Sequence, residues 1–587
     1  MAFAVFIMLL FMPMCLTQED SAQKIVPSSD NTVAAALKLS LSPTHLYASH
    51  EGARLHPNAT TLINTLMDLV ELPYVEQHWQ GKRGDLQSLK ELIRSGRALF
   101  PLSEEQQQQQ QQQEQKQQVQ QEEENQGSGE LSSWLTAVER CITAVQEGPS
   151  YPLLRRVLSA LLLETWLAAG SSWSEAHDAV ARRILLKLYD LHAVSARQKS
   201  AVEYYHFSKA AGTSMCVTSA AAGCTTFSVK EQYTCLVPEF GDGPRWINRK
   251  AHNSRCRRVL PGFSQCLTKL YTKLAKWGLR YNTRSAVVGC EERAAWLSDR
   301  GFNFYASEYT LRGRSGNVTA PPALCSGFLN LAVVRDPLSR IYSHMRYVVQ
   351  TTYDWMGERT ADYMHNMTLQ DWRRLLPAVF DNYYIRGLLG EEGFYARTGA
   401  LNDSVHLPAA RSVISAMDVV LILEDPEALL QLGHAWGLGW PRTFTHAAGR
   451  SSSRLHKDVA RIISTVVPMG EAAMELATAN SLDGQLYDFA VLMSRLDSVV
   501  WAVAEAAGLS PPAAAISYPD GDRPMGHSAH GFGISHGHGH VYSRSSSSSN
   551  DRIPCGYVAP KWPKPPSPPM APNATDWAPP PPPPDPT

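Results

Sequence analysis

One segment near the middle of the chain carries a positive charge, a glycine and hydroxyl groups in the order expected of an anion-binding turn. It follows the apolar and aromatic run Ala201–Tyr205. The residues of this turn that could contact an anion are Lys209, Ala211, Gly212, Thr213 and Ser214. Glycine permits close approach of the backbone, amides at a helix start point toward an anion, and lysine adds a fixed charge. The pattern predicts a strand, a phosphate-binding loop and a helix start, and hence an anionic cofactor.

A second apolar run, Leu329–Val334, ends at a charged corner farther along the chain. Pro337 suits the first turn of a helix, and polar residues then recur at helical spacing. The residues that this pattern brings toward one strand end are Arg335, Arg340, Ser343 and Arg346. We therefore expect these four side chains to converge at that corner.

Together the two motifs resemble the cofactor motifs of Golgi-type carbohydrate sulfotransferases, which use 3′-phosphoadenosine 5′-phosphosulfate (PAPS). The chain reads His-x-x-Lys-x-x-Gly-Thr-Ser from His206 and Arg-Asp-Pro-x-x-Arg-x-x-Ser-x-x-Arg-Tyr from Arg335. The resemblance spans residues 201–509, and one departure is Ala210, where many relatives have a hydroxyl residue. It implies 5′-phosphosulfate contacts from Lys209, Gly212, Thr213 and Ser214, and 3′-phosphate contacts from Arg335 and Ser343.

The order of residues in the first motif argues against an ATP-binding loop. A Walker A motif places lysine directly after its last glycine, whereas Lys209 precedes Gly212. Two alternatives to a sulfotransferase stay open. One is a P-loop nucleotide phosphotransferase, and the other is a non-catalytic extracellular matrix protein whose domain binds glycans.

Sulfonyl transfer also requires a base that accepts the proton of the acceptor hydroxyl. The alternating aromatic segment 301–311 predicts a strand that ends at Glu308, and related enzymes carry the base on a strand between the two motifs. Glu308 is the first candidate for the base and His252 the second, although a strand-end glutamate in an ordinary salt bridge is an equal alternative. His206 is expected to orient the loop. No metal is expected.

Two further segments have both a functional and a structural interpretation. The most basic stretch of the chain, residues 245–258, is either a solvated face or a groove for an anionic acceptor. Asn382 and Arg386, in a segment similar to one near the acceptor site of related enzymes, contact either a ligand or the protein itself.

Charge and targeting signals restrict the class of partner. The 587 residues have a formal net charge of -1, so no global charge favours nucleic acid or an anionic membrane as a partner. The apolar segment 1–16 suits a signal peptide or a single N-terminal anchor. We expect the secretory pathway, with the protein in the Golgi lumen, anchored or secreted, and a glycan or glycoprotein as acceptor.

The clustering of the cysteines also favours the secretory pathway. Seven of the ten fall between Cys216 and Cys325, which predicts disulfides that close the loops around the site, although the sequence does not give their pairing. Sequons for N-glycosylation occur at Asn58, Asn317, Asn366, Asn402 and Asn573.

Composition and periodicity divide the chain into six parts. They are a signal peptide or anchor (1–17), a region of unknown role (18–101), a Gln-rich linker (102–130), a helical stem or cap (131–198), the catalytic domain (199–510) and a disordered tail rich in His, Ser and Pro (511–587). The expected class is α/β: a three-layer, P-loop-like sulfotransferase fold with a mainly parallel central sheet and the cofactor lying across the strand ends.

Overall fold

The structure is a computed structural model. It describes residues 57–69, 87, 90, 91, 94, 95, 120–144, 152–170, 173–227, 234–267, 287–311, 324–425, 432–437, 457–468, 470–509 and 555–558. The predicted leader, the sequons at Asn317 and Asn573 and most of the predicted tail lie outside these ranges.

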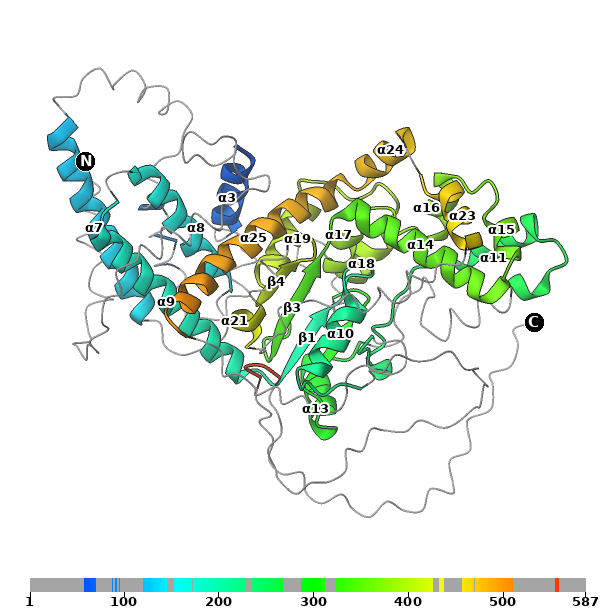
Figure 1. Cartoon of the computed structure of the whole chain (residues 1–587), viewed down its shortest axis with the longest axis horizontal. Helices are drawn as coiled ribbons and strands as arrows, with labels where there is room; N and C mark the ends of the chain where they lie inside the picture. The colour runs from blue at the N-terminus through cyan, green and yellow to red at the C-terminus, as the bar shows by residue number, and fades with distance from the viewer. Residues whose placement is uncertain are drawn as a thin grey trace, which may run out of the picture.

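Four parallel strands form the sheet at the centre of the molecule (Figure 1), which confirms the predicted α/β class with a parallel sheet. They are β1 (Ala201–Tyr205), β2 (Phe304–Ser307), β3 (Phe328–Val334) and β4 (Val419–Ile422), in the order β2-β1-β3-β4. Every strand residue is buried, as expected of parallel strands covered on both faces.

The register of the sheet brings the predicted site segments to one edge. Tyr205 of β1 pairs with Ser307 of β2 and with Ala332 of β3. Because parallel strands end at the same edge, the loop after β1 lies between the segments that follow β2 and β3. Those segments begin with Glu308 and Arg335.

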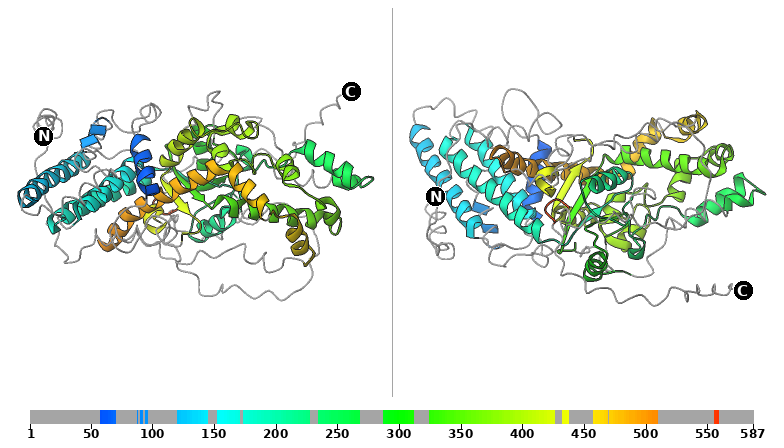
Figure 2. Two further views of the ribbon diagram at one scale, coloured as in Figure 1. Left: turned by 90° about the horizontal axis from the view of Figure 1, so that it is seen from above. Right: turned by 60° about the horizontal axis from the view of Figure 1, so that its bottom comes forward.

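Three long helices precede the sheet where apolar periodicity predicts them: α7 (Gln120–Ala144), α8 (Pro152–Ala169) and α9 (Glu175–Gln198). They lie together at one end of the molecule in all three views, with α3 (Pro57–Leu69) next to α8 (Figures 1 and 2). The start of α7 falls within residues 102–130, so the last part of the predicted linker is helical.

The long helix α25 (Ser481–Ala506) joins these helices to the sheet, because it packs on α8, α9 and β4. Asp497 of α25 accepts hydrogen bonds from Arg155 Nε and Arg156 Nη2 of α8, each at 2.8 Å. All three side chains are buried. The helical region and the sheet therefore share one interior.

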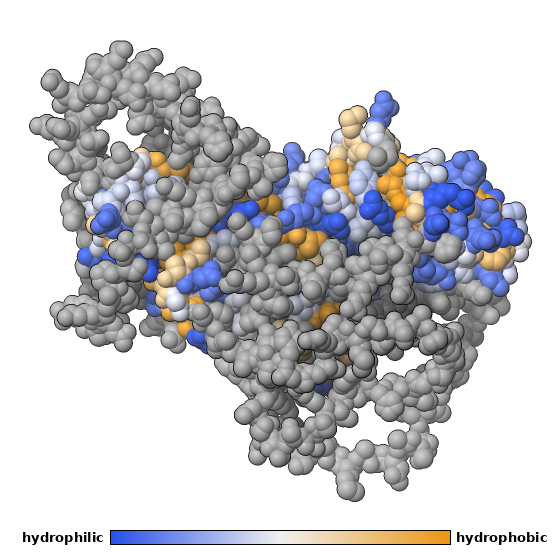
Figure 3. All heavy atoms as spheres, in the orientation of Figure 1, coloured by the Kyte–Doolittle hydropathy of each residue, from blue (hydrophilic) through white to orange (hydrophobic). Residues whose placement is uncertain are grey.

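The remaining helices lie around the sheet and at the end of the molecule opposite α7, α8 and α9 (Figure 1). They are α10 (Gly212–Ala221), η3 (Pro238–Phe240), α11 (Arg249–Val259), α13 (Cys290–Asp299), α14 (Pro337–Met356), α15 (Arg359–Met364), α16 (Leu369–Leu375), α17 (Tyr383–Leu388), α18 (Gly390–Tyr395), α19 (His406–Ser415), α21 (Leu432–Trp436), α23 (Lys457–Val466) and α24 (Glu471–Ala479). Figure 3 shows mostly hydrophilic side chains at the end that carries α11 and α15.

Four disulfides confirm the prediction made from the cysteines. They are Cys216–Cys235, Cys224–Cys555, Cys256–Cys266 and Cys290–Cys325. All seven clustered cysteines are paired, and the eighth partner comes from the C-terminal part of the chain. Disulfides at this density indicate an oxidising, secretory or extracellular environment.

Residues 555–558 differ from the disordered tail to which the sequence assigns them. Cys555 is bonded to Cys224, Tyr557 N donates to Trp436 O at 2.8 Å, and the Tyr557 hydroxyl lies 2.7 Å from that of Tyr189. Composition describes the average of a segment, whereas a disulfide and one aromatic side chain fix these few residues.

None of the helices in the described ranges is both long enough and apolar enough to cross a membrane. The apolar segment 1–16 is not part of these ranges.

Candidate functional site

The loop between β1 and α10 has the backbone of an anion-binding turn. Lys209 and Ala211 adopt left-handed conformations, with φ of 70° and 65°, which non-glycine residues rarely do. Helix α10 begins at Gly212, and no side chain of the described residues caps it. The amide groups at its start have no intrahelical acceptor, so they suit a negatively charged ligand.

Close packing explains the glycine in this loop. A Cβ atom on Gly212 would lie 1.8 Å from Cε1 of His206, a distance at which two atoms cannot coexist. The His206 ring stacks on Tyr204, and the Tyr204 hydroxyl donates to Ala210 O at 2.8 Å. His206 therefore packs directly against the loop at Gly212.

The two predicted motifs meet at the strand ends. Arg335, directly after β3, donates from Nη1 to the Lys209 carbonyl at 3.3 Å. Its Nε lies 3.5 Å from Oε1 of Glu424, just beyond β4. The Tyr384 hydroxyl donates to Arg335 O at 2.6 Å and fixes the backbone there. The loop after β1 and the residue after β3 are thus in direct contact through Lys209 and Arg335.

The pKa of Lys209 is shifted by its surroundings. Its Nζ lies 4.2 Å from the centre of the Tyr347 ring. Burial lowers the pKa of Lys209 to about 8; the charge of Glu308 opposes this shift and that of Arg335 adds to it. A bound anion would favour the protonated amine, so this lysine is poised to respond to a phosphate or sulfate group.

Glu308 lies close to the loop, as predicted. It is buried, its Oε2 lies 3.4 Å from Nδ1 of His206, and its backbone N–H donates to Asp242 O. The carboxylate also acts electrostatically on Lys209. A potential base and a cation that could stabilise an anionic leaving group therefore lie close together.

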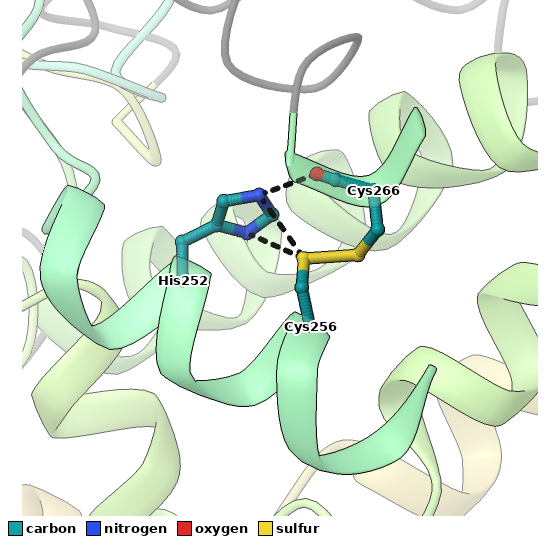
Figure 4. Close-up of side chains that lie close together, drawn as sticks. All are labelled: His252, Cys256 and Cys266. Atoms are coloured by element: carbon teal, nitrogen blue, oxygen red, sulfur yellow. Dashed lines mark hydrogen bonds between the residues drawn. A yellow bond between two sulfur atoms is a disulfide. The ribbon is translucent and has the colours of Figure 1, made fainter. Parts of the chain in front are cut away.

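His252, the second candidate for the base, is engaged elsewhere. Figure 4 shows its ring against the Cys256–Cys266 disulfide, with Nε2 2.9 Å from Cys266 O. Its Nδ1 lies 2.8 Å from the Tyr363 hydroxyl, and burial lowers its pKa to about 4. With both ring nitrogens bonded within the protein, His252 serves the packing of α11 on α15.

The same three residues have the composition of a metal site, but their chemistry argues against one. His252, Cys256 and Cys266 offer a nitrogen and two sulfur atoms close together. The two sulfur atoms are bonded to each other, and metal ligation by cysteine needs a free thiolate.

The expected convergence of Arg335 with three side chains of α14 is only partly found. Arg340 is buried, donates to Val379 O at 2.9 Å and lies over the Tyr383 ring, 4.5 Å from its centre. Ser343 is half-buried, whereas Arg346 is exposed. Three-residue spacing winds these side chains around the helix, so only part of the set can face the loop.

A buried polar cluster beneath Lys209 was not predicted. The Trp246 indole donates to Ser208 Oγ at 2.9 Å, and Ser208 Oγ lies 2.8 Å from the Tyr383 hydroxyl. The His344 ring packs on Trp246, and neither of its nitrogens has a hydrogen-bond partner among the described residues. Burial, together with the charges of Arg340 and Lys209, lowers its pKa and so favours the neutral ring. Ser208 and His344 stand within the two motifs, which is the signal that could have identified them.

Asn382 and Arg386 make structural hydrogen bonds. Oδ1 of Asn382 accepts from the backbone N–H of Leu482 and of Asp483, each at 3.1 Å. Arg386 pairs with Asp381 and donates to several carbonyl groups. Asn382 thus holds the start of α17 against α25, whereas Arg386 ties α17 to the end of α18.

Only part of the basic stretch is a solvated face. Arg255 is buried, donates to Tyr363 O at 2.7 Å and pairs with Asp371, and Arg258 pairs with the same carboxylate. Lys250 and Arg257 are exposed. Part of the charge therefore holds α11 in place, and the rest faces solvent.

Comparison with protein-family models, with curated proteins and with solved structures found no match for this chain. Its function is therefore inferred from its own residues and their geometry.

Proposed function

We propose that this chain is a PAPS-dependent carbohydrate sulfotransferase, which transfers a sulfonyl group to a hydroxyl or an amine of a glycan or glycoprotein in the Golgi lumen. The observation that carries the proposal is the 3.3 Å hydrogen bond from Arg335 to the Lys209 carbonyl, which joins the two motifs. Both residues follow neighbouring parallel strands, at the edge where ligands of such sheets bind. One nucleotide can contact both cations.

The three-layer sulfotransferase fold belongs to the same proposal. It is supported by the parallel sheet and by the loop that leads from an inner strand, β1, into a helix.

Each motif would hold one phosphate-bearing end of PAPS. Lys209 and the loop residues Ala211, Gly212, Thr213 and Ser214 would bind the 5′ side. Arg335 and Ser343 would bind the 3′-phosphate, and that phosphate distinguishes PAPS from ATP. Charge-assisted hydrogen bonds of this kind are among the strongest available to a protein.

The transfer step needs a base and a stabilised leaving group. The acceptor oxygen forms a bond to sulfur while the bond between sulfur and the bridging oxygen of the 5′-phosphate breaks. Glu308 takes the acceptor proton, with His206 beside its carboxylate at 3.4 Å. Lys209 stabilises the negative charge that develops on the bridging oxygen.

Transfer of radiolabelled sulfate from PAPS to a panel of polysaccharides tests the proposal. We expect Lys209→Ala to abolish transfer and Arg335→Ala mainly to weaken binding of PAP, the desulfated product. Arg257→Ala removes an exposed arginine of α11 and is the matched control, with unchanged transfer. Unchanged PAP affinity in Arg335→Ala would show that the second motif is misassigned.

Glu308→Gln separates the base from the binding site. The amide keeps the shape of the carboxylate but accepts no proton, so we expect transfer to fall by at least about 100-fold while PAP affinity stays within a few fold. Calorimetric titration with PAP measures the second quantity. If Glu308→Gln transfers sulfate at the wild-type rate, a residue other than Glu308 is the base.

Thermal unfolding with ATP or PAP, together with the transfer assay, distinguishes the two alternative functions. A nucleotide phosphotransferase would be stabilised against heat by ATP more than by PAP. A non-catalytic glycan-binding protein would bind PAP without sulfating any polysaccharide.

A further inference from the structure

We infer that Asn402 carries an N-linked glycan whose first sugars lie in a polar cavity beside it. This inference is independent of sulfotransfer and depends on the oxidising route that the four disulfides indicate. Asn402 begins the sequon Asn402-Asp403-Ser404, and both Asn402 and Ser404 are exposed.

The turn holds the Asn402 side chain with its amide nitrogen available. Oδ1 accepts from Val405 N at 2.9 Å and from Ser404 Oγ at 3.4 Å. The backbone N–H of Asn402 donates to His406 Nδ1 at 3.1 Å. Nδ2, the atom that glycosylation modifies, makes no hydrogen bond within the described part of the chain.

A second sequon makes a useful contrast. At Asn366 the sequon hydroxyl belongs to Thr368, which accepts a hydrogen bond from Asp371 N and thereby caps α16. In the folded protein the Thr368 hydroxyl accepts a hydrogen bond from the start of α16, whereas the Ser404 hydroxyl donates to Oδ1 of the sequon asparagine.

The cavity beside Asn402 has a volume of about 460 Å³, within the range of ligand pockets. Its two main walls come from distant parts of the chain, residues 398–403 and residues 478–485, and Arg373, Asp381 and Asn382 also line it. The lining side chains that make no hydrogen bond to another described residue are those of Thr398, Asp403, Ser481 and Gln485. Hydroxyl and amide groups both donate to and accept from sugar hydroxyls, and a carboxylate accepts from them, so this lining matches a neutral sugar.

The modification is a glycosyl transfer from a lipid-diphosphate-linked oligosaccharide. Nδ2 of Asn402 forms a bond to C1 of the first sugar while the bond between C1 and the diphosphate oxygen breaks. The amide nitrogen loses one proton, and the lipid diphosphate leaves with the electron pair. As the chain folds, the attached sugars fill the cavity and link its two walls.

The matched variants Ser404→Ala and Ser404→Thr test both parts of the inference. Ser404→Ala removes the sequon and leaves the bond from Val405 N to Asn402 in place, whereas Ser404→Thr keeps the sequon. We expect mass spectrometry of the full chain, secreted from eukaryotic cells, to find a glycan on Asn402 in the wild type and in Ser404→Thr but not in Ser404→Ala. An unmodified Asn402 in the wild type would overturn the inference.

Docking in the cavity is measured by thermal unfolding. We expect the unglycosylated Ser404→Ala protein to unfold about 2–4 °C below Ser404→Thr. In the Gln485→Ala background, which removes part of the opposite wall, this difference should shrink. Equal unfolding temperatures of the Ser404 pair, with the glycan present only in Ser404→Thr, would show that the sugars lie in solvent and would overturn the docking.

Discussion

The protonation of the Lys209 side chain is coupled to the binding of an anion. Its pKa of about 8 is far below that of a free lysine, and burial is the main cause. The native state therefore binds fewer protons than the unfolded chain between about pH 8 and pH 10, and through this residue stability rises with pH in that window. A bound anion would raise the pKa of Lys209 again, because it favours the protonated amine.

We predict that PAP affinity falls as pH rises above about 8, by up to tenfold per pH unit. The reason is that the phosphate groups stay ionised while Lys209 loses its proton. In Lys209→Arg the charge persists, so the affinity should hardly change from pH 7 to pH 9.5. Calorimetric titrations at several pH values measure both. Identical pH profiles for the two proteins would contradict the prediction.

Residue types alone predict part of this site. Lys209 and Arg335 stand in recognisable motifs, and the structure brings them together. Ser208, Trp246 and His344 were missed, because their contacts depend on how α14 packs on the loop. A motif gives the chemistry of a side chain, but its partners come from the tertiary structure.

At the scale of elements, the loop after β1 and the start of α10 form one unit whose shape depends on Gly212. The segments that form β1, β2 and β3 were recognisable because each is short and rich in apolar residues. Their order was not, since parallel pairing joins segments that are distant in the sequence, such as β1 with both β2 and β3.

We predict that Gly212→Ala abolishes PAP binding and sulfate transfer while the protein stays folded. The new methyl group would displace the His206 ring, from which it is separated by only 1.8 Å, and so would disturb the contact of that ring with Glu308. Circular dichroism and calorimetry measure folding and binding.

Gly484→Ala is the control for this substitution. A Cβ there meets no atom within 4 Å, and the residue is inside helix α25, where alanine is favoured over glycine. We expect unchanged PAP binding. Retained binding in Gly212→Ala would show that the loop tolerates the shift of His206.

At the scale of the whole molecule, the Cys224–Cys555 disulfide fastens the C-terminal part of the chain to the end of α10. Cys216–Cys235 holds the same helix nearer its start. The sequence predicted disulfides around the site but not this pairing. Cys555 is 331 residues from its partner, and no local pattern marks such a contact.

We predict that Cys224→Ser/Cys555→Ser lowers the free energy of unfolding by about 2–4 kcal/mol, because the open chain gains entropy when it unfolds. Denaturant titration measures this loss. Tyr557→Phe is the control, since it removes only the hydroxyl that meets Tyr189, and we expect a loss of about 1 kcal/mol. Equal stability of the double variant and the wild type would show that Tyr557 alone holds the segment.

The packing of α8 on α25 limits how far the chain can be truncated from its N-terminal side. Removing residues 131–198 would leave the Asp497 carboxylate without both of its arginine partners in a buried position, and would expose the apolar side of α25 to water. The protein that carries out the proposed reaction thus has to begin well before β1, and a truncation at the apparent catalytic boundary should aggregate.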